Sequence, residues 1–110
     1  IKSYLQSVFI NLVSNAIKYK KINSIPEINI KSYLKDDKVY VTFQDNGLGI
    51  DLEKDSSKLF GLYKRFHYHV EGKGLGLHLV KTQVETMGGK IEVESQVNVG
   101  TTFTICIPHV

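Results

Sequence analysis

Residues 88–108 read GGKIEVESQVNVGTTFTICIP, and this stretch decides the fold of the chain. Two runs in it alternate with a period of two, which predicts two strands that each bury one face. The inward positions of these strands are Ile91, Val93 and Ser95, then Phe103, Ile105 and Ile107. Residues 98–101 between them favour a turn, so the two strands are expected to pair antiparallel. The Gly88-Gly89 pair before them is typical of a left-handed cap that ends a helix.

Upstream of this stretch, apolar residues recur every three or four positions from about residue 75, which predicts a helix that ends at Gly88. A longer pattern of the same kind predicts a first helix from Tyr4 to about Lys20. Pro26 favours extended backbone before it, and two further runs with a period of two flank a polar turn at residues 35–38. The order is therefore helix, hairpin, loop, helix, hairpin. It predicts a two-layer α/β sandwich with both helices on one side of the sheet.

The length and composition fit a single domain over residues 1–110. The chain has 42% hydrophobic and 23% charged residues, which is ordinary for a globular protein. No apolar run approaches the roughly 18 residues that a membrane span needs. The single cysteine, Cys106, excludes an internal disulfide framework and argues against a cysteine metal site. A net charge of +3 suits a polyanionic ligand but does not select one.

Four groups of residues could carry chemistry. In the first helix, Asn11 and Asn15 lie one turn apart on one face, and Lys18 and Tyr19 continue that face. The pair is either part of a solvated polar face or a source of amide oxygens for Mg²⁺. The second group starts at Asp45, which has the inward parity of its strand. A carboxylate there either begins a turn or accepts a hydrogen bond from a ligand amino group.

The third group is the segment from about residue 51 to 72, whose aromatic and basic residues suit either a nucleic-acid surface or a lid over a phosphate ligand. His67 and His69 in it lack partners at ligand spacing, which argues against a metal site. The fourth group is VEGKGLGLHLV, residues 70–80, where three alternating glycines enter a helix. They form either a flexible hinge or a row of backbone amides that receives phosphate.

The order of these motifs is more specific than any one of them. NLVSNAIKY, DNGLGI, LFGLYKRF, GKGLGLHLV and GGKIEVESQVNVGTTFTICIP follow one another from about Leu5 to Pro108. This order strongly resembles the ATP-binding catalytic domain of bacterial sensor histidine kinases, within the GHKL group. The resemblance implies the Bergerat ATP-binding fold, an α+β sandwich with a mixed, mostly antiparallel sheet and helices on one face.

The resemblance also implies ligands and site residues. The ligand is ATP with Mg²⁺, and Asn15 is the implied metal ligand. Asp45 is implied to accept from the adenine amine, Lys18 and Arg65 to approach phosphate, and Tyr19 to contact adenine or ribose. Phe60 and Phe66 resemble a further motif of the family. The implied nucleotide-binding residues are Asn11, Asn15, Lys18, Tyr19, Asp45, Gly47, Gly49, Arg65, Gly72, Lys73, Gly74, Gly76 and Thr102, with Thr101 beside the last.

The implied activity is transfer of the γ-phosphoryl group of ATP to a histidine. None of the four histidines has the sequence setting of an acceptor, so the acceptor is expected on a separate helical dimerisation domain of a longer parent. The isolated chain is then expected to bind nucleotide with little activity of its own. Lys73 departs from the family pattern, because many relatives have Ser or Thr there.

The expected partners are that helical domain, a response regulator receiver domain and a second copy of the parent, with no nucleic acid. The expected location is the cytoplasm, whether or not the parent is anchored in a membrane. Two alternatives remain from the sequence: another GHKL ATPase or serine kinase, and an inert ATP-binding interaction module. A basic nucleic-acid-binding domain is a third and weaker alternative.

Overall fold

In the computed structural model, which describes residues 2–55 and 76–109, the chain begins with helix α1 (Lys2–Lys18). Its apolar stripe buries Val8, Leu12 and Ala16, as the three- and four-residue spacing predicts. The second long helix, α3 (Gly76–Thr86), buries Leu77, Val80 and Val84. These two helices are confirmed to within about two residues at each described end.

The end of α3 is a left-handed cap. The Gly88 N–H donates to the Glu85 carbonyl and the Gly89 N–H to the Val84 carbonyl, both at 2.9 Å. Gly88 has a φ of 81°, which a residue without Cβ adopts at little cost. This is the Schellman arrangement, and it confirms the predicted role of the glycine pair.

The strands form two hairpins. Strands β1 (Ile28–Lys35) and β2 (Lys38–Asp45) are joined through Asp36 and Asp37, both at positive φ, as a type I′ turn requires. Strands β3 (Lys90–Gln96) and β4 (Gly100–Pro108) are joined by residues 97–99. A short helix, α2 (Leu52–Asp55), follows β2 and has no counterpart in the sequence prediction.

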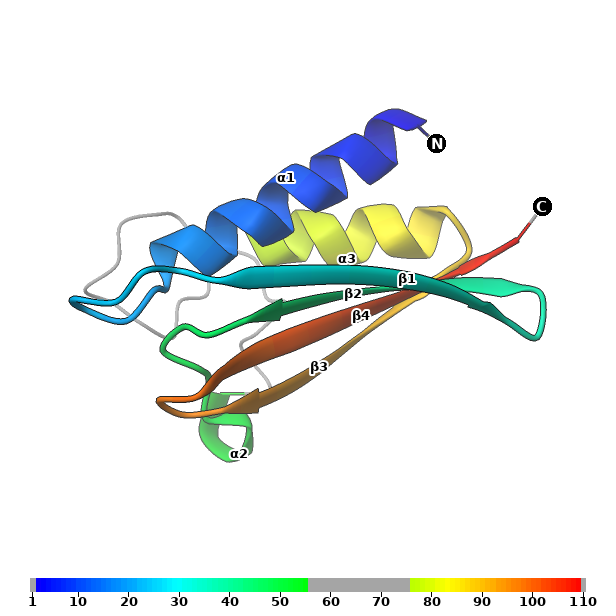
Figure 1. Ribbon diagram of the computed structural model, residues 1–110. Coiled ribbons are helices and arrows are strands. Elements are labelled where there is room, and N and C mark those ends of the chain that lie inside the picture. The colour runs from blue at the N-terminus through cyan, green and yellow to red at the C-terminus, as the bar shows by residue number, and fades with distance from the viewer. Residues whose placement is uncertain (1, 56–75, 110) are drawn as a thin grey trace.

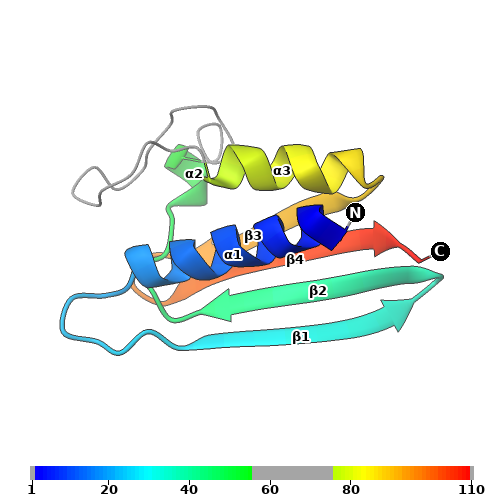
Figure 2. The ribbon, with the colours of Figure 1, turned by 90° about the horizontal axis from the view of Figure 1, so that it is seen from above.

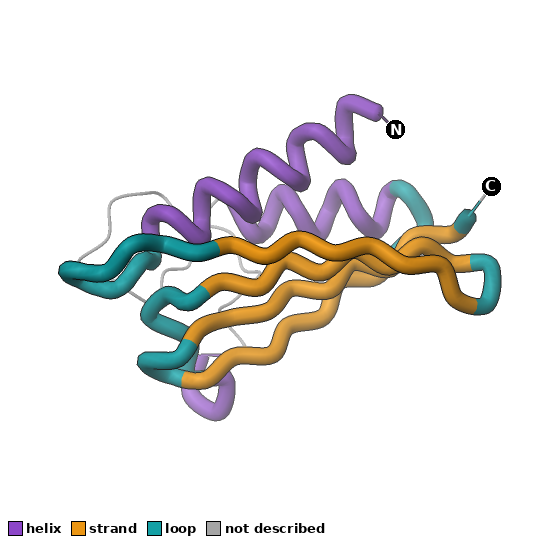
Figure 3. Tube along the Cα trace, in the orientation of Figure 1, coloured by secondary structure: helices purple, strands orange, loops and turns teal. Residues whose placement is uncertain are grey.

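Within the described residues the strands form one sheet in the order β1-β2-β4-β3. Every strand pair in it is antiparallel, and the α+β class is confirmed. The sequence prediction was a mixed, mostly antiparallel sheet, and the described residues contain no parallel pair. Both long helices lie on one face of this sheet (Figures 1 and 3). The core lies between the layers and consists of Val8, Leu12, Val41, Phe43, Ile50, Leu77, Val80, Val84, Phe103 and Ile105.

Several helix and strand ends lie together at one end of the sandwich. The carboxyl end of α1, the start of α3, the end of β2 and the β3–β4 turn all lie there (Figures 1 and 2). In the sheet register, Asp45 on β2 faces Thr101 on β4, and Thr101 faces Ser95 on β3. Among residues 2–55 and 76–109, no helix combines the length and apolar character needed to cross a membrane.

Candidate functional site

A small pocket opens at this end of the sandwich, between the helices and the sheet. It brings together residues from α1, β2, the loop after β2, α3 and β4. Its lining residues are Asn15, Tyr19, Asp45, Gly49, Ile50, Leu77, Thr101 and Phe103. Four of these belong to the nucleotide-binding set predicted from the sequence: Asn15, Tyr19, Asp45 and Gly49. The pocket therefore unites residues that are far apart in the chain.

Asp45 provides a half-buried carboxylate at the floor of the pocket. Its Oδ1 atom accepts hydrogen bonds from the Gly47 N–H at 2.9 Å and from the Thr101 N–H at 3.3 Å. Within the described residues no donor reaches Oδ2, so this oxygen is open to a ligand. Burial raises the pKa of Asp45 above its ordinary value by disfavouring the charged form, and the two N–H donors oppose that shift. The carboxylate is thus held in place and accepts hydrogen bonds.

The loop after β2 is pressed against two other segments. The Leu48 N–H donates to the Tyr19 carbonyl at 2.8 Å, and the Asn98 N–H donates to the Leu48 carbonyl at 2.7 Å. A Cβ on Gly47 would lie 2.5 Å from the Tyr19 carbonyl oxygen, so only glycine fits there. These contacts fix the loop between the end of α1 and the β3–β4 turn.

Two hydroxyl groups lie next to each other at the pocket: Thr101, which the resemblance placed near the adenine, and Ser95, which was not predicted as a site residue. The Ser95 hydroxyl accepts from the Ile50 N–H at 2.8 Å and donates to the Gly100 carbonyl at 2.9 Å. The Thr101 hydroxyl lies 2.7 Å from it. Because each hydroxyl has one proton and the carbonyl can only accept, Thr101 must donate to Ser95. The remaining lone pairs of Thr101 are then available to accept from a ligand.

A second missed residue, Asn46, anchors the same loop from the other side. Its side-chain Oδ1 accepts from the Glu27 N–H at 2.8 Å, and its Nδ2 donates to the Ile25 carbonyl at 3.2 Å. The signal for Ser95 was present in the sequence, because it is a polar residue at an inward strand position. Nothing comparable in the sequence indicated the brace made by Asn46.

Asn15 lines the pocket from α1, and Asn11, one turn before it, lies beside the start of α3 without lining the pocket. The Oδ1 atoms of Asn11 and Asn15 lie 3.6 Å and 3.8 Å from the position that a Cβ on Gly76 would occupy. Gly76 is the first residue of α3, and the amino end of a helix carries partial positive charge. The structure therefore brings together two predicted asparagines and one predicted glycine.

These residues fit a magnesium ion. The space beside Gly76 that a Cβ would fill is flanked by two amide oxygens, which are hard ligands of the kind Mg²⁺ accepts. Magnesium commonly uses one or two protein oxygens together with phosphate oxygens and water. Across the described residues no group of three or more His, Cys, Asp or Glu side chains could hold a metal. Amide oxygens are therefore the donors this end of the pocket offers.

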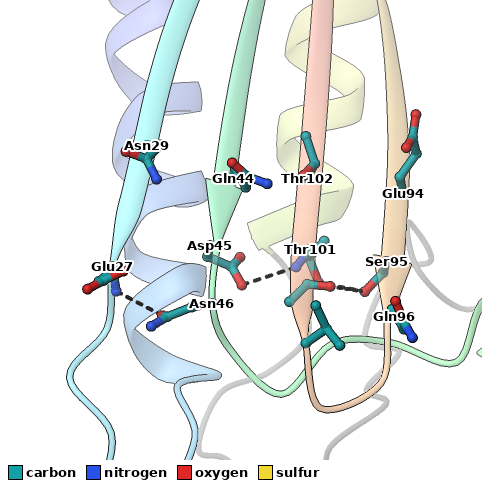
Figure 4. A pocket seen from close by; sticks show the side chains of 12 residues that line it. Glu27, Asn29, Gln44, Asp45, Asn46, Glu94, Ser95, Gln96, Thr101 and Thr102 are labelled. Atoms are coloured by element: carbon teal, nitrogen blue, oxygen red, sulfur yellow. Dashed lines mark hydrogen bonds between the residues drawn. The ribbon is translucent and has the colours of Figure 1, made fainter.

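Other predicted site residues lie elsewhere. Lys18 is exposed at the last turn of α1 and does not line the pocket. Thr102 lies on the outer face of the sheet, away from the helices, because side chains alternate along β4 and its neighbour Thr101 points inward (Figure 4). Thr102 therefore does not line the pocket, whereas Thr101 beside it does, and a nucleotide contact by Thr102 stays a prediction. The predicted residues outside the described ranges are Phe60, Arg65, Phe66, Gly72, Lys73 and Gly74.

A larger, open groove of about 480 Å³ lies on the outer face of the sheet. Figure 4 shows its lining side chains, among them Glu27, Gln44 and Glu94. Three carboxylates line the groove, those of Glu27, Asp45 and Glu94, and they would repel phosphate, while no described Lys or Arg lines it. Asp45 borders both spaces, but only the smaller inner pocket adds the Asn15 amide and the start of α3 to it, so the inner pocket is the better candidate site.

Comparisons with known proteins agree on one family. The model of the histidine kinase-, DNA gyrase B-, and HSP90-like ATPase family matches residues 2–110. Sensor protein RprX of Bacteroides fragilis is 38% identical over 109 residues, which are 96% of this chain and 21% of RprX. The chain thus spans about a fifth of the length of that relative.

Solved structures give the same family. The catalytic domain of histidine kinase ThkA, in a nucleotide-free form, matches with a TM-score of 0.81 and 32% identity, covering 98% of this chain and 69% of that one. The mycobacterial sensor histidine kinase MprB matches with a TM-score of 0.85 and 25% identity, covering 98% and 74%.

Proposed function

This chain belongs to the histidine kinase-, DNA gyrase B-, and HSP90-like ATPase family, as the ATP-binding catalytic domain of a sensor histidine kinase, and we propose that it presents the γ-phosphoryl group of Mg²⁺-ATP to a histidine on a separate helical domain. The observation that carries the proposal is that one pocket has two chemically different ends. One end offers the open Oδ2 of Asp45, and the other offers the amide oxygen of Asn15, with the amide oxygen of Asn11 near it beside the start of α3.

The end at Asp45 suits the adenine base. An exocyclic amine is a donor, and Oδ2 of Asp45 is an open acceptor on a carboxylate whose Oδ1 accepts from two backbone N–H groups. Phe103 and Ile50 supply apolar surface for the ring, and Tyr19 and Leu77 border it. Guanine presents a carbonyl oxygen where adenine has its amine, so it would place an acceptor against an acceptor. We therefore assign adenine selectivity to Asp45.

The end at Asn15 suits the phosphates. Magnesium, when bound, would be held by Asn15 and neutralise charge on the phosphate oxygens. Asn11 lies one turn away with its oxygen on the same side. The amino end of α3, like that of any helix, carries partial positive charge and attracts anions. The resulting role of this chain is to fix the triphosphate while the γ-phosphorus stays open to attack.

The reaction itself depends on positioning. A nitrogen of the acceptor histidine forms a bond to the γ-phosphorus as the bond to the bridging oxygen of the β-phosphate breaks, and ADP leaves. The acceptor, the carboxylate that takes the imidazole proton, the second copy of the parent and a response regulator would all lie beyond this chain. The share of RprX that this chain spans, 21%, is compatible with such additional domains. Because ATP is the ligand, we place the domain on the cytoplasmic side.

The first test is binding of a fluorescent ATP analogue to the 110-residue chain, with Mg²⁺ and with a chelator in its place. We expect saturable binding that is tighter with Mg²⁺ and is displaced by ATP but not by GTP. Absence of detectable binding up to millimolar analogue would contradict the proposal. Displacement by GTP as effective as by ATP would remove the adenine role from Asp45.

Gly76→Ala tests the phosphate end separately from folding. The new Cβ would make ordinary contacts with the amide oxygens of Asn11 and Asn15, and alanine is the better helix former. We therefore expect an unfolding free energy equal to or slightly above that of the wild type. The methyl group would occupy the space between the two oxygens, so affinity for Mg²⁺-ATP should fall by about tenfold or more. Denaturant unfolding and the same titration measure both quantities, and unchanged affinity would remove this space from the phosphate site.

A further inference from the structure

The outer face of the sheet is turned away from both long helices (Figures 1 and 3). Side chains alternate along a strand, so the sheet register shows which residues share this face. They are Asn29, Lys31, Tyr33 and Lys35 on β1, Lys38, Tyr40, Thr42 and Gln44 on β2, Thr102, Thr104, Cys106 and Pro108 on β4, and Lys90, Glu92, Glu94 and Gln96 on β3. Each of these side chains is exposed or half-buried, so the face is accessible to a partner.

Charge on this face is divided between the two edges of the sheet. Lys31 and Lys35 lie on β1 at one edge, and Glu92 and Glu94 lie on β3 at the other. Between these edges, β2 and β4 contribute neutral side chains apart from Lys38 at the hairpin end. Among the described residues, none of these charged groups forms an ion pair, so both edges can pair with a partner.

The sheet register sets the outer residues side by side in rows that cross the four strands. One row begins with Lys31 on β1 and ends with Glu92 on β3. The next row begins with Asn29 and ends with Glu94, and both of these residues line the open groove of about 480 Å³. In both rows the β1 residue is a hydrogen-bond donor and the β3 glutamate is an acceptor.

These rows match those of a second copy that faces the first after a half-turn about an axis parallel to the strands. The half-turn keeps each row at its level and reverses the order of the strands, so β1 lies over β3 of the second copy. Lys31 then meets Glu92 of the second copy, and each contact occurs twice by symmetry. In the neighbouring row Tyr33 meets Lys90 of the second copy, so that lysine is not opposed by another.

The charges exclude the other face-to-face arrangement. A half-turn about an axis across the strands would place β1 over β1, so the lysine edges would repel each other and so would the glutamate edges. We propose that the outer face binds the same face of a second copy of this chain in the first arrangement. A separate acidic or basic partner would match one edge only, whereas a second copy matches both.

The size of the face predicts a weak and reversible dimer. Four strands spaced about 4.8 Å apart, each about seven residues long at about 3.4 Å per residue, give a face of roughly 450 Å² per copy. Two such faces bury roughly 900 Å², which is at the low end for specific protein interfaces. The edge charges are exposed and are screened by salt, so the dimer should weaken as ionic strength rises.

Sedimentation equilibrium of the 110-residue chain measures this dimer. We expect a concentration-dependent dimer at low salt that weakens at high salt. Lys31→Glu turns two attractive contacts into two repulsive ones, so it should weaken the dimer about tenfold or more at low salt, and Glu92→Lys should do the same. Lys20→Glu makes the same change in net charge at an exposed position after α1, and this control should associate as the wild type does.

Mixing the two charge reversals completes the test. In an equimolar mixture of Lys31→Glu and Glu92→Lys, both edge contacts of the mixed dimer again join opposite charges, so its affinity should return to within about threefold of the wild type. Such recovery also excludes misfolding as the cause of the losses. A monomer at low salt up to millimolar concentration, equal weakening by Lys31→Glu and Lys20→Glu, or no recovery on mixing would each overturn the proposal. No nucleotide is present, so none of these outcomes bears on ATP binding.

Discussion

Asp45→Asn should bind ATP about 100-fold more weakly than the wild type while folding at least as well. Asparagine has the same shape, and its Oδ1 can still accept from the N–H groups of Gly47 and Thr101. Its second terminal atom is an NH₂ group in place of Oδ2. An NH₂ group that faces the adenine amine places one donor against another, and the charge-assisted hydrogen bond is lost as well. Together these two effects account for the expected loss of ATP affinity of about 100-fold.

The stability of this variant should depend on pH in a defined direction. The folded-state pKa of Asp45 is raised above its unfolded value, chiefly by burial, so the folded protein binds a proton more readily than the unfolded chain does. Above the folded pKa, the charged group therefore lowers the stability of the wild type. Asp45→Asn removes that cost, and its advantage should shrink as pH falls from the folded pKa towards the unfolded one.

Isothermal titration of nucleotide and denaturant unfolding at several pH values check both parts. The pH effect also applies to binding, because protonation of Asp45 removes the acceptor and should weaken ATP in the wild type but not in Asp45→Asn. A suitable control is Gln44→Asn, which lies one position away on the outer face and should leave ATP affinity unchanged. Equal affinity of wild type and Asp45→Asn would exclude Asp45 from adenine recognition.

Strand parity explains which site residues could be found from the sequence. Counting by two from Val41 and Phe43 places Asp45 on the inward face, and the structure confirms that it is half-buried there. The same count along β4, back from Ile105 and Phe103, gives Thr101 as the inward residue. Motif resemblance named Thr101 and Thr102 together, because a motif records the order of residues but not the face on which each lies. Strand alternation adds that face and places Thr101, not Thr102, towards the helices.

Other features depended on contacts between distant segments. Lys18 is exposed because α3 begins beside the preceding turn of α1. Gly76, the first residue of α3, lies near Asn11 and Asn15 and not near Lys18. No periodicity within α1 contains that information. The brace from Asn46 to Ile25 and Glu27 likewise depends on how the loop before β1 returns to the end of β2. Helices, hairpins and the cap at Gly88 are local, and the sequence predicted them.

Replacement of Gly49 should strongly destabilise the fold. It has a φ of 73°, it is buried, and a Cβ there would collide with the backbone carbonyl of Gln96. The Leu48 carbonyl and the Ile50 N–H on either side of it are hydrogen-bonded to Asn98 and Ser95. The loop therefore cannot move away from β3 without losing both bonds, and the collision cannot be relieved cheaply.

Gly88→Ala separates the two sources of that cost. Gly88 has a similar φ of 81°, but a Cβ there would meet only the Pro108 side chain, at 3.6 Å, which is an ordinary contact. We expect Gly88→Ala to lose about 1 kcal/mol of unfolding free energy, from backbone strain alone. Gly49→Ala should lose about 3 kcal/mol or more, because overpacking against backbone is added to that strain.

Urea unfolding of the two variants beside the wild type measures the difference. A loss of about 3 kcal/mol is a large part of the stability of a small domain, so Gly49→Ala should also bind ATP poorly at 37 °C and recover in part on cooling towards its most stable temperature. Equal losses for Gly49→Ala and Gly88→Ala would mean that the loop yields to the new Cβ. In that case the hydrogen bonds of Leu48 and Ile50 do not hold it rigidly, and the placement of Asp45 would have to depend on β2 and β4 alone.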